Sequence, residues 1–269
     1  GLGDVYKRQI LVLARPQTTN KWQNSEIEGI DIMLAIDVST SMLAEDLKPN
    51  RLEAAKDVAA EFINGRPNDN IGITLFAGET FTQCPLTVDH AVLLDMIHNI
   101  KCGLITDGTA VGMGIANAVT RLKDSKAKSK VIILLTDGTN NKGDISPMTA
   151  AEIAKSFGIR VYTIGVGTNG MAPYPYPVGN TVQYVSMPVE IDEKTLTEIA
   201  GTTDGNYFRA TSNSKLKEVY EEIDKLEKTK LNVKEYSKRD EEYHWFALAA
   251  FLCVLLEVLL RNSVLKKIP

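Results

Sequence analysis

Oxygen-bearing side chains follow two apolar runs of the chain. The segment DVSTS brings Asp37, Ser39 and Ser41 directly after DIMLAI, and Asp137 ends a second apolar run, KVIILLTD. A third segment, TDGT, adds Thr109 in front of another apolar stretch. Carboxylate and hydroxyl oxygens are the hard ligands that Mg²⁺ prefers, and both hydroxyls of an Asp-x-Ser-x-Ser turn can face one ion. We therefore expect a magnesium site, with Mn²⁺ and Ca²⁺ as alternative ions, that leaves one coordination position for a carboxylate of another molecule.

The same residue types also suit ordinary local structure, so a second interpretation stays open. In it, the two aspartates merely cap helices and the two serines merely turn the chain. Among the hydroxyls of TDGT, Thr109 is a better ligand candidate than Thr106. It stands directly before AVGMGIANAV, where it could also cap a helix.

The elements that would position these residues follow the βαβ pattern of a parallel sheet. Apolar runs alternate with amphipathic stretches, and their β-branched and leucine content is typical of strands buried on both faces. The expected strands are 31–37, 71–78, 130–137, 160–167 and 206–210. The expected helices are 51–66, 88–100, 110–123, 149–157, 193–200 and 214–228. We expect a doubly wound, Rossmann-like α/β fold, a mostly parallel sheet flanked by helices, whose strand ends bring the polar residues to one edge.

Composition and charge exclude several classes of protein. The 269 residues are 44% hydrophobic and 24% charged, which excludes a disordered, collagen-like or coiled-coil chain. A net charge of −4 without a basic cluster argues against nucleic acid as the main partner. Three cysteines without a CxxC pair make a disulfide framework or a zinc knuckle unexpected. Cys84 and Cys102 flank one expected helix and would either pair with each other or remain separate thiols.

Enzymatic function is not expected, although one distant alternative is phosphoryl transfer through Asp37. Haloacid-dehalogenase phosphatases use Asp-x-Asp, and here Ser39 stands in place of the second acid, so the general acid is missing. GVGTNG matches the glycine pattern of dinucleotide-binding folds. The proline-rich MAPYPYP that follows it excludes the helix start that would hold a pyrophosphate.

A long connection follows the strand that ends near residue 167. It interleaves prolines with tyrosines, namely Pro173, Tyr174, Pro175, Tyr176, Pro177, Tyr184 and Pro188. We expect a packed hairpin that turns at Val178-Gly179-Asn180. Because connections of this length are usually functional or disordered, we hypothesise that its aromatic side extends the binding surface at the sheet edge.

The C-terminal part of the chain has the composition of a membrane segment. WFALAAFLCVLLEVLL, residues 245–260, contains a single charged side chain, with aromatic residues before it and basic residues after it. This pattern predicts a transmembrane helix at 243–262, with an interfacial helix as the alternative. A linker at 229–242 precedes it and a short basic tail at 263–269 follows it.

The N-terminal end predicts that the sequence is a fragment. Residue 1 is Gly rather than Met, and GLGDVYKRQ (1–9) resembles the tail that sequencing-adaptor read-through leaves on a translation. We therefore treat 1–9 as artefactual. The apolar ILVLA (10–14) could be a buried strand or the last turns of a membrane helix whose beginning is missing. We adopt the second and interpret 10–28 as the end of a truncated membrane helix followed by a linker.

These motifs together resemble a known family. The five oxygen-donor residues and their positions after strands are similar to the metal-ion-dependent adhesion site of von Willebrand factor A domains, over residues 29–228. In more detail, DVSTSMLAEDLKPNRLEAAK, FTQCPLTVDHA, DGTAVGMGIANAVTRLK and TIGVGTNG resemble the Bat aerotolerance proteins, above all their BatA branch.

The resemblance implies a function and a location. It implies a bacterial inner-membrane protein with a periplasmic domain. In that domain, the acidic side chain of a protein partner would complete the coordination of Mg²⁺. Asp37, Ser39, Ser41 and Thr109 would hold the ion directly or through water, with Asp137 outside them or acting through water. A complex with a MoxR-type AAA+ ATPase and other Bat proteins, and a role in aerotolerance or stress response, are implied as well. The alternative is a scaffold whose metal site is vestigial and whose contacts run through helices and the proline-tyrosine hairpin.

Overall fold

The computed structural model describes residues 29–137, 140–178, 181–189 and 191–232, together with Phe251 and Leu255. All but the last two belong to one compact unit, Ile27–Lys234. Within these described residues, no helix combines the length and the apolar character needed to cross a membrane.

The segments predicted at the two ends of the chain lie almost entirely outside the described residues. The N-terminal segments 1–9 and 10–28 lie outside the described residues. So do the transmembrane helix predicted at 243–262, apart from Phe251 and Leu255, and the basic tail at 263–269. These assignments therefore stay predictions.

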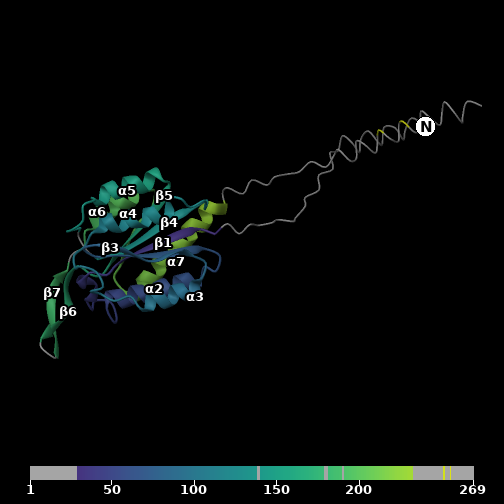
Figure 1. Ribbon diagram of the computed structural model, residues 1–269. Coiled ribbons are helices and arrows are strands. Elements are labelled where there is room, and N and C mark those ends of the chain that lie inside the picture. Colours follow the sequence, from purple (N-terminus) through teal and green to yellow (C-terminus); the bar gives the residue numbers. More distant parts are fainter. Residues whose placement is uncertain are drawn as a thin grey trace, which may run out of the picture. The chain divides into compact units, whose positions relative to one another are not determined.

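A six-stranded sheet lies at the centre of the unit (Figure 1). Its strands are β1 (Asp31–Asp37), β2 (Asn70–Phe76), β3 (Thr80–Thr87), β4 (Lys130–Thr136), β5 (Ile159–Val166) and β8 (Tyr207–Ala210). Their order is β3-β2-β1-β4-β5-β8, and every neighbouring pair is parallel except β2 and β3. The predicted, mostly parallel sheet is confirmed. The antiparallel edge strand β3 was not predicted, because TFTQCPLT mixes polar residues and a proline and has no continuous apolar run.

Helices cover both faces of the sheet, as the doubly wound pattern predicts (Figure 1). One face carries α2 (Arg51–Asn64), α3 (His90–His98) and α7 (Asn213–Asn232). The other face carries α4 (Val111–Leu122), α5 (Pro147–Ser156) and α6 (Glu193–Thr202). All six correspond to predicted helices, and each end agrees within four residues.

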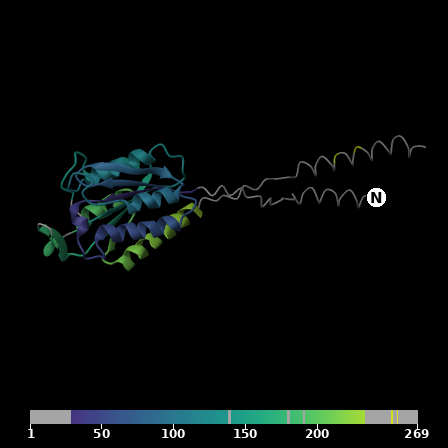
Figure 2. The ribbon, with the colours of Figure 1, turned by 60° about the horizontal axis from the view of Figure 1, so that its bottom comes forward.

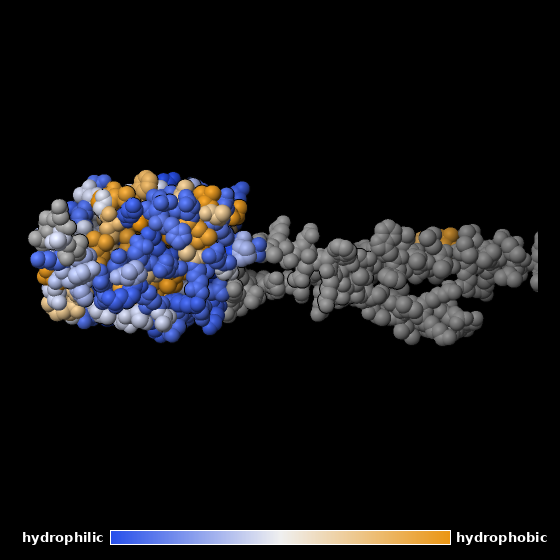
Figure 3. All heavy atoms as spheres, turned by 90° about the horizontal axis from the view of Figure 1, so that it is seen from below, coloured by the Kyte–Doolittle hydropathy of each residue, from blue (hydrophilic) through white to orange (hydrophobic). Residues whose placement is uncertain are grey.

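Side chains that alternate along β1 pack into both hydrophobic cores, one on each face of the sheet. Ile32, Leu34 and Ile36 pack into the core under α2, α3 and α7, whereas Met33 and Ala35 pack into the core under α4, α5 and α6. This follows from the two-residue period of a strand, which sends successive side chains to opposite faces. The helices turn polar residues outward: the face seen in Figure 3 is largely hydrophilic with separate apolar patches.

Two features of the helices bear on the strand ends. Asn50 caps α2, since its side-chain oxygen accepts a hydrogen bond from the Glu53 backbone N–H at 2.8 Å. Gly112 lets α4 pack against the segment that enters α5, because a Cβ at this position would lie 2.1 Å from the Ile145 carbonyl oxygen. The loop before α4 is fixed in turn by a backbone bond from Ala110 N–H to Ala77 O at 2.7 Å.

Helix α7 lies beside α2 (Figure 2) and is joined to the sheet by a buried carboxylate. Glu227 accepts hydrogen bonds from the Ser129 hydroxyl at 2.8 Å, from Arg160 Nε at 2.9 Å and from the Tyr162 hydroxyl at 2.5 Å. Since Arg160 and Tyr162 belong to β5, this contact fixes α7 on the sheet at the amino end of β5.

The long proline-tyrosine connection forms a separate two-stranded antiparallel sheet. Its strands are β6 (Gly170–Val178) and β7 (Thr181–Val189), paired so that Val178 lies opposite Thr181. The predicted hairpin and the place of its turn are thus confirmed. The prediction that the hairpin is packed is wrong, because it projects from the rest of the unit and most of its described side chains are exposed (Figure 1).

Candidate metal site

The two predicted carboxylates lie at the carboxyl ends of neighbouring parallel strands. Asp37 is the last residue of β1, and Asp137 directly follows β4, which pairs with β1. Both side chains belong to buried residues, with exposed fractions of 0% for Asp37 and 2% for Asp137. The strand order therefore brings together two acids that are 100 residues apart in the sequence, as expected for ligands at the edge of an open α/β sheet.

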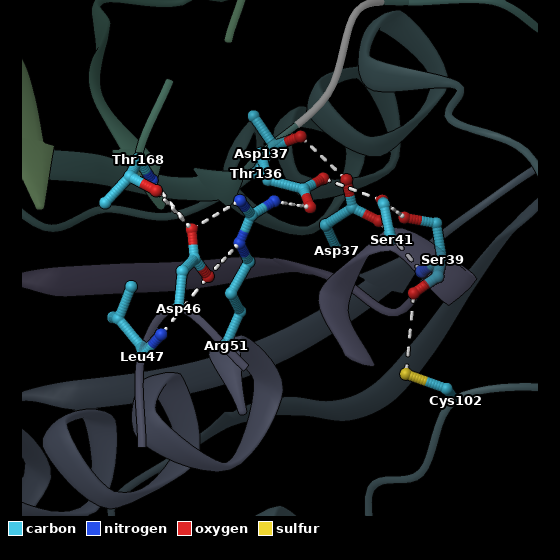
Figure 4. A network of polar contacts seen from close by, with 10 residues as sticks. All are labelled: Asp37, Ser39, Ser41, Asp46, Leu47, Arg51, Cys102, Thr136, Asp137 and Thr168. Atoms are coloured by element: carbon cyan, nitrogen blue, oxygen red, sulfur yellow. Dashed lines mark hydrogen bonds and ion pairs between the residues drawn. The ribbon is translucent and has the colours of Figure 1, made fainter. Parts of the chain in front are cut away.

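Hydrogen bonds join four of the five predicted residues into one cluster (Figure 4). Asp37 Oδ1 accepts the backbone N–H of Ser39 at 2.9 Å, and its Oδ2 accepts the Thr136 hydroxyl at 2.7 Å. The hydroxyls of Ser39 and Ser41 lie 2.9 Å apart, and Ser41 donates to Asp137 Oδ1 at 2.8 Å. The turn that holds both serines continues into a short 3-10 helix, η1 (Thr40–Leu43).

The helix-cap interpretation finds little support in this geometry. Neither Asp37 nor Asp137 is the N-cap of the helix that follows it: Ser39 is the N-cap of η1, without a side-chain capping bond, and Ser146 is the N-cap of α5. The N-cap of α4 is Ala110 rather than Thr109. The carboxylate of Asp37 does stabilise the turn through Ser39 N–H, so the turn interpretation holds in part. The two serine hydroxyls are left directed toward each other and toward Asp137 (Figure 4).

The loop that carries Thr109 lies against η1. Asp107 in this loop accepts hydrogen bonds from the Thr40 N–H at 3.0 Å and from the Thr40 hydroxyl at 2.9 Å. Thr109 is buried, its backbone N–H donates to the Asn141 side-chain Oδ1 and its carbonyl oxygen accepts the Asn141 N–H, both at 2.9 Å. Thr106 is exposed and donates to Glu79. The hydrogen bonds described for the cluster do not include the Thr109 hydroxyl, so its role as a ligand stays a prediction.

A buried arginine, which was not predicted from the sequence, completes the cluster. Arg51, with 1% of its surface exposed, places Nη1 2.5 Å from Asp137 Oδ2. Its Nε and Nη2 bind both oxygens of Asp46 at 2.7 Å and 2.6 Å. One signal could have indicated this burial: Arg51 stands four and seven residues before Ala55 and Val58, the spacing of a single apolar helix face.

The electrostatics of the cluster favour a cation. Burial, followed by the charge of Asp137, raises the pKa of Asp37 to about 7. Burial also raises the pKa of Asp137, although Arg51 opposes this shift. Burial alone would raise the pKa of Asp46 too, but hydrogen bonds from Arg51 and from Thr168 N–H hold it below its usual value. When ionised, three carboxylates against one guanidinium leave two negative charges, which one divalent ion would neutralise.

The donor set also indicates the class of ion. Among the described residues, no group of three or more His, Cys, Asp or Glu side chains could hold a metal. The cluster instead combines two carboxylates with hydroxyls, which are oxygen ligands that suit Mg²⁺ or Mn²⁺ better than a soft metal. The residues present therefore fit a hard divalent cation.

The nearby thiols are not part of this donor set. Cys84 lies buried on β3, Cys102 lies partly buried after α3, and both are free, so the alternative of separate thiols applies. The Cys102 thiol donates to the Ser39 carbonyl oxygen at 3.4 Å. Burial, and then the charges of Asp37 and Asp137, raise the pKa of the Cys102 thiol to about 12.

Comparison with solved structures places this geometry among known proteins. Conserved hypothetical protein BatB from Bacteroides thetaiotaomicron is 35% identical, with a TM-score of 0.66, over 74% of this chain and 100% of that chain. An aerotolerance-related membrane protein from Bacteroides fragilis, carrying multiple mutations to serines, is 34% identical, with a TM-score of 0.64, over 73% of this chain and 100% of that chain. Proximal thread matrix protein 1 from the mussel byssus, with a zinc-occupied MIDAS motif, is 25% identical, with a TM-score of 0.59, over 74% of this chain and 46% of that chain.

Curated sequences add relatives without a described activity. An uncharacterised protein of Borreliella burgdorferi is 28% identical over 261 residues, which cover 96% of this chain and 76% of that protein. A UPF0353 protein of Mycolicibacterium paratuberculosis is 32% identical over 203 residues, 70% of this chain but only 58% of that protein. The model of the von Willebrand factor type A domain matches residues 31–222. This chain therefore belongs to the von Willebrand factor type A domain family and is related to the Bat aerotolerance-type proteins.

Proposed function

We propose that this chain binds a protein partner through a divalent metal ion, Mg²⁺ in the first place, whose coordination is completed by an acidic side chain of the partner. The observation that carries the proposal is the cluster of two buried carboxylates and two serine hydroxyls with an excess of negative charge. Asp37, Ser39, Ser41 and Thr109 would hold the ion directly or through water, with Asp137 further out. The bound ion would supply a positive charge that attracts the partner's carboxylate.

Mg²⁺ is favoured by ligand chemistry, and Mn²⁺ and Ca²⁺ remain its competitors. All five residues offer oxygen, the ligand atom that Mg²⁺ prefers. The mussel relative is described with zinc in its MIDAS motif, which supports a divalent ion at this position of the fold but not a particular one. Competition between the three ions in a binding titration decides among them.

The proposal describes a binding module rather than an enzyme. Phosphoryl transfer through Asp37 would need a second acid two residues later, and Ser39 stands there with its hydroxyl directed at Ser41. Domains of this family are in general interaction modules, which agrees with the absence of a general acid from the motif.

The location and partners follow from the resemblance. The relative from Bacteroides fragilis is described as an aerotolerance-related membrane protein. We propose that residues 243–262 anchor this chain in the bacterial inner membrane, with the von Willebrand factor A domain in the periplasm. A MoxR-type AAA+ ATPase and sibling Bat proteins are the proposed partners, and aerotolerance or stress response the proposed role.

Metal binding is tested first, on the full chain. Isothermal titration with Mg²⁺ should give one site for the wild type and none for Asp37→Ala. Asp57→Ala, which removes an exposed acid on α2, is the matched control and should bind like the wild type. An Asp37→Ala variant that folds and binds Mg²⁺ as the wild type does would contradict the assignment of the site.

Partner binding is tested next, with the purified ATPase and sibling Bat proteins as candidates. Capture by the wild type in Mg²⁺ should be lost in EDTA and in Asp37→Ala. The second candidate function is a scaffold with a vestigial metal site, which the exposed apolar hairpin favours. Equal capture in all three arms would support the scaffold and refute the metal-dependent mechanism.

A further inference from the structure

The β6–β7 hairpin exposes apolar side chains on a segment with little support of its own. Exposed fractions are 63% for Met171, 57% for Tyr176 and 43% for Met187. An isolated two-stranded hairpin is marginally stable in water, so the contacts at its root must fix its position. Exposed apolar patches of this kind commonly mark interaction sites.

One chain of contacts joins the root of the hairpin to the metal site (Figure 4). Thr168, two residues before β6, donates its backbone N–H to Asp46 Oδ2 at 2.7 Å and its hydroxyl to the same oxygen at 3.1 Å. Asp46 is held by Arg51, whose Nη1 lies 2.5 Å from Asp137 Oδ2. The turn approaches the guanidinium so closely that a Cβ on Gly167 would lie 2.5 Å from Arg51 Cζ.

A second set of contacts holds the hairpin to the segment after η1. The Glu45 backbone N–H donates to the Pro173 carbonyl oxygen of β6 at 2.9 Å. The Tyr184 hydroxyl of β7 bonds to the Glu45 carboxylate, which raises the pKa of Tyr184. Because Glu45 follows Ser41 by only four residues, both strands of the hairpin are tied to the segment that carries the metal-site hydroxyls.

We propose that the hairpin is the second half of the partner-binding surface and that the buried Asp46–Arg51 pair couples it to the metal ion. This inference rests on the proposed function. The occupant is a protein segment that presents a carboxylate to the metal and, beside it, an aromatic or aliphatic side chain to the hairpin. The contacts of Glu45 and Asp46 with Pro173 and Thr168 hold the hairpin to the segment that carries Ser39 and Ser41, and this attachment supports one shared partner over two separate ones.

The physical basis of the coupling is competition for Asp137. A cation beside Asp137 weakens the ion pair between Arg51 and Asp137. It therefore strengthens the ion pair between Arg51 and Asp46. Asp46 Oδ2 accepts from both Arg51 Nη2 and Thr168 N–H, so a carboxylate that Arg51 fixes more firmly holds Thr168, and with it the root of the hairpin, in a narrower range of positions. By linkage, a partner that orders the hairpin also raises the affinity for the ion.

Hydrogen exchange tests the coupling in the full chain. Mg²⁺ should slow amide exchange in 170–178 and 181–189 by about threefold or more in the wild type. Asp46→Asn should abolish this effect, and Thr168→Val, which deletes one bond only, should weaken it. Asp69→Asn is the control, since it makes the same change in another arginine pair, with Arg66. If Mg²⁺ leaves hairpin exchange unchanged in the wild type, or if Asp46→Asn responds like the wild type, the coupling is refuted.

A random peptide library tests the shared surface. Phage peptides bound to the full chain in Mg²⁺ and released by EDTA should contain an acidic residue next to an aromatic or aliphatic one. They should bind the Tyr176→Ser, Met187→Ser double variant about tenfold more weakly, with unchanged Mg²⁺ affinity. Phe157→Ser, which removes an apolar side chain that is 43% exposed elsewhere, should bind them like the wild type.

Three other outcomes would overturn the inference in distinguishable ways. EDTA-released acidic peptides that bind the double variant as tightly as the wild type would refute the role of the hairpin and leave the metal-dependent function standing. No EDTA-released peptide at all would refute both. Binding to anionic phospholipid vesicles that the double variant loses, without any effect on peptides, would assign the hairpin to a lipid surface instead.

Discussion

The buried carboxylate of Glu227 offers a quantitative test of how the fold is held together. Glu227 is 1% exposed and accepts hydrogen bonds from Ser129, Arg160 and Tyr162. Glu227→Gln preserves the size of the side chain but removes its charge. It also turns an NH₂ group toward a site at which each of these partners is a donor.

The expected loss of stability can be worked out from these contacts. A charge-assisted hydrogen bond exceeds a neutral one by about 0.5–1 kcal/mol, and a buried donor left without an acceptor costs about 1–3 kcal/mol. The share of Arg160 is discounted because its side chain is 22% exposed. Together these effects give about 3 kcal/mol, in the range of about 3–5 kcal/mol for breaking a buried ion pair.

Urea unfolding followed by circular dichroism measures this loss. With a slope of about 2 kcal/mol per molar for a domain of this size, the midpoint should fall by about 1.5 M. Glu218→Gln is the control, because Glu218 and its partner Lys215 are both exposed, and its midpoint should not move. A Glu227→Gln midpoint within about 0.3 M of the wild type would refute the argument that this carboxylate holds α7 on the sheet.

The pH dependence of unfolding is a second, independent test that the ionised Glu227 stabilises the fold. Burial alone would raise the pKa of Glu227, but bonds from Arg160 and Tyr162 outweigh it and hold the pKa below its ordinary value of 4.5. The stabilisation is therefore complete above about pH 4.5 and is lost as the pH falls through the lowered value. The difference between wild type and Glu227→Gln should be constant from pH 7 to 5 and should shrink in stronger acid.

Three further changes test the site and its support. Asp37→Asn should raise the melting temperature in EDTA, because it removes repulsion between two buried carboxylates, and should abolish the gain that Mg²⁺ gives the wild type; a retained gain would contradict the site. Gly112→Ala should lower the free energy of unfolding by about 2 kcal/mol or more, because its Cβ would meet the Ile145 carbonyl, whereas Gly201→Ala, with open space around it, should be neutral or stabilising in the same urea assay. Asn50→Ala should cost about 1 kcal/mol by removing the cap of α2, and a loss of Mg²⁺ affinity in this variant would show that the start of α2 also positions Arg51.

Local pattern was sufficient for most of the sheet and for its polar edge. β1, β2, β4, β5 and β8 are short apolar runs, and a buried parallel strand needs nothing else to be recognised. Because the carboxyl ends of parallel strands share one edge, Asp37, Ser39, Ser41 and Asp137 could be placed together from the sequence alone. The strand order and the hydrogen bonds between them agree with that placement.

Tertiary structure alone decided what surrounds this cluster. Arg51 reaches Asp137 across 86 residues, and Asp46 reaches Thr168 across 122, so no local periodicity records either contact. The edge strand β3 could not be predicted from the local pattern either. A strand with one side free to solvent tolerates polar residues and a proline, so it has no continuous apolar run. The sequence determined the fold class and the oxygen donors through local rules of burial. The compensation of their charge, and the connection of the site to the hairpin, depend on side chains that meet only after the chain has folded.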